Sequence, residues 1–151
     1  MIILLCKKKS MISKVEKKWL IIDAKDEILG RLSTQIARIL IGKNKIDYTF
    51  NKDISDNLII INSLQIDITG CKRHKKNYYK HTGFPGGIKK RSISNIFSSK
   101  EPERILRMAV IRMMPKESSL ARKKIKKLYI YPNKEYHQFS QKPIFIKINK
   151  Q

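Results

Sequence analysis

The stretch WLIIDAKDEILGRLSTQIARILIG, residues 19–42, decides the fold. It opens with WLIID, a short apolar run without alternation, which is typical of a buried strand. The apolar positions that follow recur every three or four residues and predict a helix with one apolar face: Ile28, Leu32, Ile36, Ile39 and Leu40. Gly42 stands where a helix-terminating glycine is expected. A strand followed by a helix resembles the first half of a βαβ unit.

Three more strands are predicted downstream of this unit. Leu58–Ile61 is again apolar without alternation, as in parallel strands that are covered on both faces. A partial alternation through Ile66 and Ile68 predicts a short strand that ends at Thr69. The last strand is predicted at residues 128–132, LYIYP.

Two further helices are predicted between these strands. Pro102 fits the first turn of the longer helix, where its missing N–H is harmless, and Pro115 ends that helix. Its apolar stripe consists of Ile105, Leu106, Ala109, Val110 and Met113. Ser118 or Ser119 can cap a final, lysine-rich helix.

The alternation of strands and helices predicts an α/β sandwich around a small, mostly parallel sheet. A length of 151 residues suits one domain better than two. We expect a basic N-terminal arm at residues 1–18, a single α/β domain at residues 19–143, and a C-terminal tail at residues 144–151.

Charge is the strongest compositional signal, because 34 Lys and Arg residues face 12 Asp and Glu residues, for a formal net charge of +22. A folded domain with this excess repels itself unless a polyanion is near, so nucleic acid is the expected partner. A membrane fits less well, because no apolar run approaches the roughly 18 residues of a membrane span.

Cysteine usage and codon bias indicate the compartment. Cys6 and Cys71 do not make a disulfide framework and indicate unpaired thiols in a reducing environment. Lysine predominates over arginine, and Ile and Asn are abundant, which indicates an AT-rich genome. We therefore expect an organelle, with a plastid as the favoured one, or the cytoplasm of a bacterium.

Neither a cofactor nor a metal site is predicted. GFPGGIKK, residues 83–90, lacks the spacing and the following Ser or Thr of a phosphate-binding loop, and only Gly30 of a dinucleotide fingerprint is present. Cys71, His74 and His81 lack the second close ligand pair of structural zinc. No Ser–His–Asp arrangement is apparent, so no catalytic residue is predicted.

The segment YYKHTGFPGGIKKR, residues 78–91, has neither a helix nor a strand period, which predicts an extended loop. Its glycines at 83, 86 and 87 lack a Cβ, so the backbone can lie against a phosphate chain. Tyr78, Tyr79 and His81 can stack on unpaired bases or riboses. One of the two tyrosines is expected to pack into the core, and the sequence does not decide which.

Basic residues gather in five clusters with few acids between them. They are the N-terminal arm, Lys43 with Lys45, Lys72–Lys80, Lys89–Arg91 and Arg122–Lys127. A single cluster is more often a solvated charged face than a binding site. Five clusters on separate elements indicate contacts with several phosphates of a nucleic acid.

Four segments together resemble the ribosomal protein L13 family of the large subunit, in its bacterial and organellar form. They are residues 19–49, residues 68–89 (ITGCKRHKKNYYKHTGFPGGIK), residues 102–116 (PERILRMAVIRMMPK) and residues 126–131 (KKLYIY). The resemblance covers about residues 19–143, and HTGFPGG and the LGRL–GK pair are its most specific motifs.

The resemblance implies a three-layer α/β/α sandwich with a four-stranded parallel sheet. It implies a non-enzymatic structural component of the ribosome that binds large-subunit rRNA and acts early in subunit assembly. Neighbouring large-subunit proteins are further implied partners, and an mRNA is a candidate partner. The basic clusters and the matched motifs together predict the RNA contacts: Arg31, Lys43, Lys45, Lys72, Arg73, Lys75, Lys76, Tyr79, Lys80, His81, Thr82, Gly83, Gly86, Gly87, Lys89, Lys90, Arg122, Lys123, Lys124, Lys126 and Lys127.

The chain departs from the family pattern in three places. Phe50 stands where the family usually has proline, and Ala121 stands where it usually has glycine. Tyr136, His137 and Gln138 replace a common His-Pro-His pattern. The lost glycine puts a close backbone approach to RNA in doubt at that position.

Two other functions use overlapping features of the sequence. A free RNA-binding module that represses a message outside the ribosome needs the same cationic surface. An RNA-processing enzyme needs acidic metal ligands, for which Asp23 and Asp67 are the candidates, although both are expected to pair with cations instead.

Overall fold

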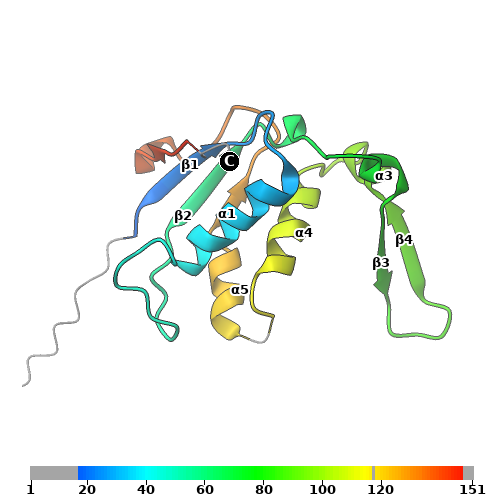
Figure 1. Cartoon of the computed structure of the whole chain (residues 1–151), viewed down its shortest axis with the longest axis horizontal. Helices are drawn as coiled ribbons and strands as arrows, with labels where there is room; N and C mark the ends of the chain where they lie inside the picture. The colour runs from blue at the N-terminus through cyan, green and yellow to red at the C-terminus, as the bar shows by residue number, and fades with distance from the viewer. Residues whose placement is uncertain (1–16, 117, 148–151) are drawn as a thin grey trace, which may run out of the picture.

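Figure 1 shows the computed structural model, which describes residues 17–116 and 118–147. Its centre is a sheet of four parallel strands in the order β5-β2-β1-β6. In chain order these are β1 (Trp19–Asp23), β2 (Asn57–Ile61), β5 (Leu128–Ile130) and β6 (Ile144–Phe145). The predicted α/β class and small parallel sheet are confirmed. The edge strand β6 pairs with β1 and lies at the start of the segment that was expected to be a C-terminal tail, residues 144–151.

Three helices cover one face of this sheet: α1 (Leu29–Ile41), α4 (Arg104–Met113) and α5 (Ser119–Ile125). They enclose the main core with the strand residues that point toward them, Leu20, Ile22, Leu58, Ile60 and Leu128. The helical period predicted for α1 is confirmed, because Leu32, Ile36 and Leu40 are fully buried. Gly42 ends α1 in a left-handed conformation, with φ at 89°.

The opposite face of the sheet is covered by aromatic side chains. Ile21, Ile59 and Ile61 point to this face because side chains alternate along a strand. Trp19, Tyr129, Tyr131 and Tyr136 pack on them, and the rings of Trp19 and Tyr129 stack with centroids 5.5 Å apart. The segment that follows β5 contributes Tyr131 and Tyr136 to this face and leads into the 3₁₀ helix η2 (Phe139–Gln141). Among the described residues, no long α-helix covers this face.

The segment predicted as an extended loop is a β-hairpin. Strands β3 (Asn77–His81) and β4 (Ile88–Ser92) pair antiparallel in a separate two-stranded sheet that projects from the body (Figure 1). The loop prediction was wrong because most of both strands is exposed to solvent, so no apolar alternation marks them. Tyr78 is the tyrosine that packs inward, against Ile93 and Ile105.

The prediction of a short strand through Ile66 and Ile68 was also wrong. A 3₁₀ helix, η1 (Ser63–Gln65), follows β2, and only an isolated bridge joins Ile28 to Asp67. The Leu29 N–H donates to the Asp67 carbonyl at 2.9 Å, so this segment runs beside the start of α1 and not along the sheet. The apolar side chains serve two different clusters, Ile66 the main core and Ile68 the cluster under Tyr78.

Smaller elements support the hairpin. Helix α2 (Lys72–Lys75) precedes β3, and helix α3 (Ile93–Phe97) follows β4 and begins where the Ser92 hydroxyl accepts a hydrogen bond from the Asn95 N–H. Pro102 lies just before α4 and not in its first turn. Met113 is 42% exposed, and Met114 is buried in its place, because the chain leaves the helix at Met114.

Candidate RNA-binding surface

The register of the hairpin sorts its side chains onto two faces. His81 pairs with Ile88, Lys80 with Lys89 and Tyr78 with Arg91, and paired residues share a face. One side, which we call the cationic face, carries Lys80, Lys89 and Arg91, with Tyr78 beside Arg91 at the base of the hairpin. The other side, the aromatic face, carries Tyr79, His81 and Ile88, together with Lys90. The sequence suggested these residue types, but only the pairing shows that they separate.

The turn of the hairpin explains its glycines. The Thr82 N–H donates to the Gly87 carbonyl at 3.0 Å, and the Gly87 N–H donates to the Phe84 carbonyl at 2.9 Å. Gly83 and Gly86 have φ values of 98° and 72°, which other residues rarely adopt. A Cβ on Gly87 would overlap the Thr82 hydroxyl and lie 2.8 Å from the Phe84 oxygen. The tight turn therefore requires glycine at all three positions and presents Phe84 to solvent.

The base of the hairpin is built from cations that lie against aromatic rings. The guanidinium of Arg112 on α4 lies 4.8 Å from the centroid of the Tyr78 ring, and the Lys76 ammonium lies 5.8 Å from the same centroid. Arg73 lies over the Phe97 ring at 5.3 Å. The sequence analysis did not predict a role for Arg112. The helical pattern shows only that Arg112 is not part of the apolar stripe of α4, and it does not indicate the contact with Tyr78.

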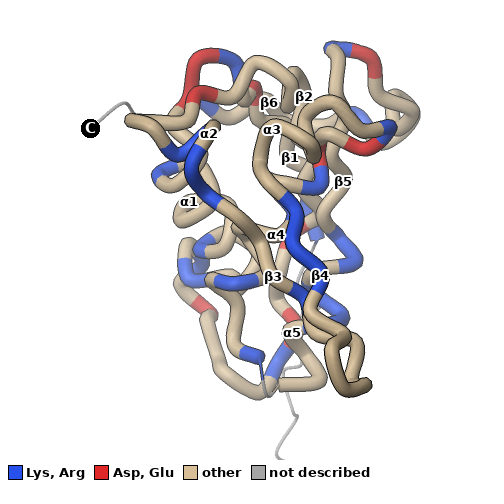
Figure 2. The backbone as a smooth tube through the Cα atoms, turned by 90° about the vertical axis from the view of Figure 1, so that its right-hand side faces the viewer, with Lys and Arg blue, Asp and Glu red and all other residues tan. Residues whose placement is uncertain are grey.

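The hairpin region carries no acid to offset these cations. Residues 68–100 include no Asp or Glu, and Figure 2 shows Lys and Arg along β4 and near the base of the hairpin. Unpaired cations on a projecting element form an electropositive surface. This geometry brings together the predicted contacts on α2, β3, the turn and β4.

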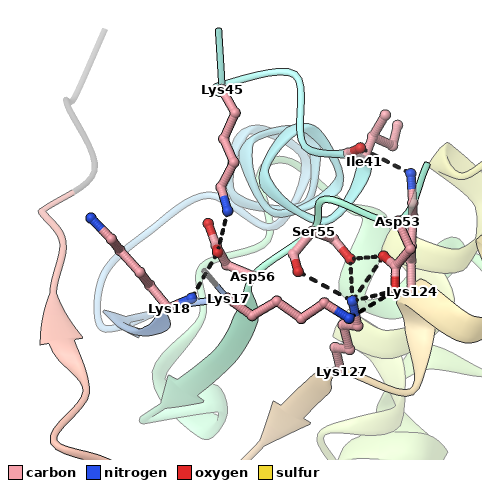
Figure 3. Close-up of polar contacts among 9 residues, drawn as sticks. All are labelled: Lys17, Lys18, Ile41, Lys45, Asp53, Ser55, Asp56, Lys124 and Lys127. Carbon is pink, nitrogen blue, oxygen red and sulfur yellow. Dashed lines mark hydrogen bonds and ion pairs between the residues drawn. The ribbon is translucent and has the colours of Figure 1, made fainter. Parts of the chain in front are cut away.

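Several predicted RNA contacts belong instead to a polar network beside the starts of β2 and β5 (Figure 3). The Lys127 ammonium contacts Asp53 Oδ2 at 2.6 Å and donates to the Ser55 hydroxyl at 2.8 Å. The Lys45 ammonium lies 2.5 Å from Asp56 Oδ1. Lys127 therefore joins the loop between α1 and β2 to the start of β5, whereas the contact of Lys45 with Asp56 lies within that loop.

Lys124 is the most buried of the predicted contacts, at 5% exposure. Its ammonium donates to the carbonyl of Ile41 at 3.0 Å, at the C-terminus of α1. The last carbonyls of a helix have no partner within the helix and carry partial negative charge, so a cation is favourable there. Lys124 thereby fixes α5 against α1.

Burial and hydrogen bonding compete in the Asp53 site. Burial by itself would raise the pKa of the Asp53 carboxyl, but the hydrogen bonds from Lys127 and Ser55 outweigh it and hold the pKa well below its usual range. Burial lowers the pKa of Lys127, and the contact with Asp53 offsets only part of that effect. The lowered pKa keeps the Asp53 carboxyl ionised at neutral pH, so it can accept hydrogen bonds from Lys127 and Ser55.

Most other predicted contacts are exposed. They are Arg31, Lys43, Lys72, Arg73, Lys75, Lys76, Tyr79, Lys80, His81, Thr82, Gly83, Gly86, Lys89, Lys90, Arg122, Lys123 and Lys126. Those on α2 and the hairpin lie together, whereas those on α5 lie on a different part of the molecule, as does Lys43 just after α1 (Figure 1).

Within residues 17–116 and 118–147, no group of three or more His, Cys, Asp or Glu side chains could hold a metal ion. Cys71 is exposed and has a free thiol, and Cys6 lies outside the described residues. In the same part of the chain, no helix is both long and apolar enough to cross a membrane.

Comparison with known protein sequences identifies the family of this chain. Residues 17–137 match the sequence model of the family described as Ribosomal protein L13. The chain belongs to the ribosomal protein L13 family. The large ribosomal subunit protein uL13 of Rickettsia bellii (strain OSU 85-389) is 46% identical over 135 residues, which cover 87% of this chain and 86% of the relative. The uL13 protein of Maricaulis maris is 45% identical over 129 residues, which cover 85% and 84%.

The departures from the family pattern have structural accounts in this chain. Ala121 is buried, and its side chain belongs to the main core, so it lies away from the surface. Tyr136 packs on the aromatic side of the sheet, and the His137 ring meets the Tyr131 ring edge-on at 5.6 Å. Phe50 is 67% exposed, in the loop between α1 and β2.

Proposed function

We propose that this chain is a structural component of the large ribosomal subunit and binds its rRNA through the β3–β4 hairpin. Membership of the ribosomal protein L13 family supports the first part. The hairpin supports the proposed binding of rRNA. It projects from the domain, has cations on one face and stacking groups on the other, and contains no acidic residue. Apart from Tyr78, most side chains of the two strands are exposed, so packing within the domain does not explain them.

The two faces meet different parts of RNA. Lys80, Lys89 and Arg91 contact phosphates and release bound counterions. Tyr79 and His81 lie on the other side of the same strand pair, where they stack on unpaired bases or on riboses. The hairpin therefore fits between an RNA backbone on one side and unpaired nucleotides on the other.

A second contact lies on α5. Arg122 and Lys123 are exposed on α5, and Lys126 is exposed directly after it. Lys124 and Lys127 anchor the same segment through Ile41 and Asp53. These two contacts thus hold the exposed cations in position relative to the sheet. Two separate basic surfaces on one chain can bind two rRNA segments, which suits a role in early subunit assembly.

We further propose that the chain binds rRNA without a catalytic role and contacts neighbouring large-subunit proteins, in keeping with its family. Its relatives named above are bacterial. A plastid origin stays a prediction from the codon bias. Repression of an mRNA is an alternative outcome of the experiment below.

The test is cross-linking of the chain to RNA in cells, followed by sequencing, combined with sedimentation of ribosomal particles. We expect the chain to sediment with large subunits and the cross-linked reads to map mainly to large-subunit rRNA. Binding to purified large-subunit rRNA should also weaken steeply with salt, by roughly 10³–10⁵ between 50 and 200 mM for about 6–10 phosphate contacts. A chain confined to ribosome-free fractions, with mainly mRNA reads, would contradict the proposal.

A further inference from the structure

A pocket of about 260 Å³ lies where the start of α1, the base of the hairpin and α4 meet. Its walls include the apolar side chains of Ile68, Ile93 and Met113, and the Tyr78 ring also lines it. This volume is a little below the roughly 300 Å³ at which pockets for drug-sized ligands begin. The pocket therefore suits a single flat ring system better than a large ligand.

Three cations line the same pocket: Lys72, Lys76 and Arg112. Among the described residues, none of the three is within ion-pair distance of a carboxylate. Lys76 and Arg112 lie against the Tyr78 ring instead. A ligand that satisfies both the walls and the cations must combine a flat apolar group with an anion.

A nucleotide has this combination, because its base has an apolar face and its phosphate is an anion. We infer that the pocket receives one unpaired nucleotide of the bound rRNA, with its base among Tyr78, Ile68 and Met113 and its phosphate on the cations. The inference rests on the proposed function and assigns a specific site to it. The hairpin and the pocket are continuous, since Tyr78 belongs to β3 and lines the pocket.

Gly30 gives independent support. It lies in the first turn of α1 and lines the pocket, and its φ is not positive. A Cβ added there would meet no atom within 4 Å apart from its chain neighbours and the backbone of its own helix. Glycine is a poor helix former, and packing within the domain leaves room for a Cβ at this position. Close approach of a ligand explains a residue without a side chain.

Gly30 also supplies a variant that tests the pocket without endangering the fold. Gly30→Leu adds a side chain beside the pocket at a position where the helix favours leucine over glycine. Its matched control is Gln35→Leu, on the same helix and outside the pocket. Arg112→Gln removes a pocket cation, and Arg107→Gln is its control for charge on the same helix.

The experiment measures the affinity of each full-length variant for purified large-subunit rRNA at one salt concentration, together with its melting temperature. We expect Gly30→Leu to melt no lower than the parent chain and to bind at least about fivefold more weakly, the low end of the cost of one lost stacked base. Arg112→Gln should bind more weakly than Arg107→Gln. Ultraviolet cross-linking with mass spectrometry should place a nucleotide on Tyr78 or Met113.

The outcomes separate the inference from the proposed function. If the parent chain binds rRNA and Gly30→Leu binds equally well, the pocket assignment is wrong and the proposed function stands. If the parent chain does not bind large-subunit rRNA, both fail. Saturation of the pocket by micromolar 5′-AMP alone would assign it to a free nucleotide and overturn the assignment to RNA.

Discussion

The ammonium of Lys127 lies 2.6 Å from Oδ2 of Asp53, and this contact ties the start of β5 to the loop that precedes β2. The two residues are 74 positions apart in the chain. Their side chains are 15% and 23% exposed, so water screens them only in part. A lysine in a run of basic residues thus serves the fold, while its exposed neighbours on α5 are free to meet RNA.

Replacing Asp53 tests the structural role of this contact. Asp53→Asn leaves the half-buried Lys127 ammonium without its charged partner, and we expect a loss of about 1–3 kcal/mol in the free energy of unfolding. Urea denaturation measures this value. The control is Glu101→Gln, which removes an exposed pair with Arg104 at 3.7 Å and should cost about 0–1 kcal/mol. Equal effects of the two substitutions would contradict the role assigned to Asp53.

The same carboxyl predicts a dependence of stability on pH. The pKa of Asp53 is lower in the folded chain than in the unfolded chain, so the unfolded state binds more protons at acid pH. The stabilisation is complete above the ordinary carboxyl pKa of 3.8 and declines as the pH falls from there toward the folded pKa. Unfolding free energies between neutral and acid pH should therefore fall less steeply for Asp53→Asn than for the parent chain, and parallel curves would refute this.

The turn of the hairpin predicts a separation of binding from stability. Gly86 has a φ of 72°, and a Cβ there would meet no atom within 4 Å apart from its chain neighbours, so Gly86→Val mainly strains the turn. We expect weaker binding to large-subunit rRNA with a small change in melting temperature, because the core lies elsewhere. A large drop in melting temperature with unchanged binding would show that the turn supports the fold instead.

The cationic face predicts a change in salt dependence. Replacing Lys80, Lys89 and Arg91 by Gln removes three phosphate contacts, and the slope of log affinity against log salt should decrease in magnitude by about 2–3. The measurement is a salt titration with large-subunit rRNA. An unchanged slope would mean that these cations face solvent in the complex.

The aromatic face predicts the complementary result. Tyr79→Ala removes a stacking ring without a change in charge, and we expect a loss of about 1–3 kcal/mol in binding free energy with the salt slope unchanged. Tyr79 is 62% exposed, so its removal should leave the melting temperature nearly the same. Binding equal to that of the parent chain would exclude a stacking role for this residue.

The sequence predicts correctly those elements whose apolar side chains are buried in the main core. The helix α1 follows its period from Leu32 to Leu40 and ends at Gly42 as expected, because burial and the glycine act locally. The hairpin was missed because its strands expose most of their side chains, and hydrogen bonds in the turn define them instead. The apolar period that marks buried elements is absent from such a segment.

The residues predicted to contact RNA fall into two groups, one that the sequence identifies and one that it does not. Exposed cations on α2 and the hairpin follow from the basic clusters, since a charged residue without a partner stays at the surface. The structural lysines could not be separated from them, because their partners are distant in the chain. Lys124 meets Ile41, which is 83 positions away, and sequence alone gives no signal for that contact.

The most direct test is the density for this chain on its own large ribosomal subunits, determined by electron cryomicroscopy. The account predicts that the β3–β4 hairpin is embedded in rRNA, with Lys80, Lys89 and Arg91 toward phosphates and Tyr79 toward unpaired nucleotides. A hairpin that extends into solvent, or subunits that lack the chain, would contradict it.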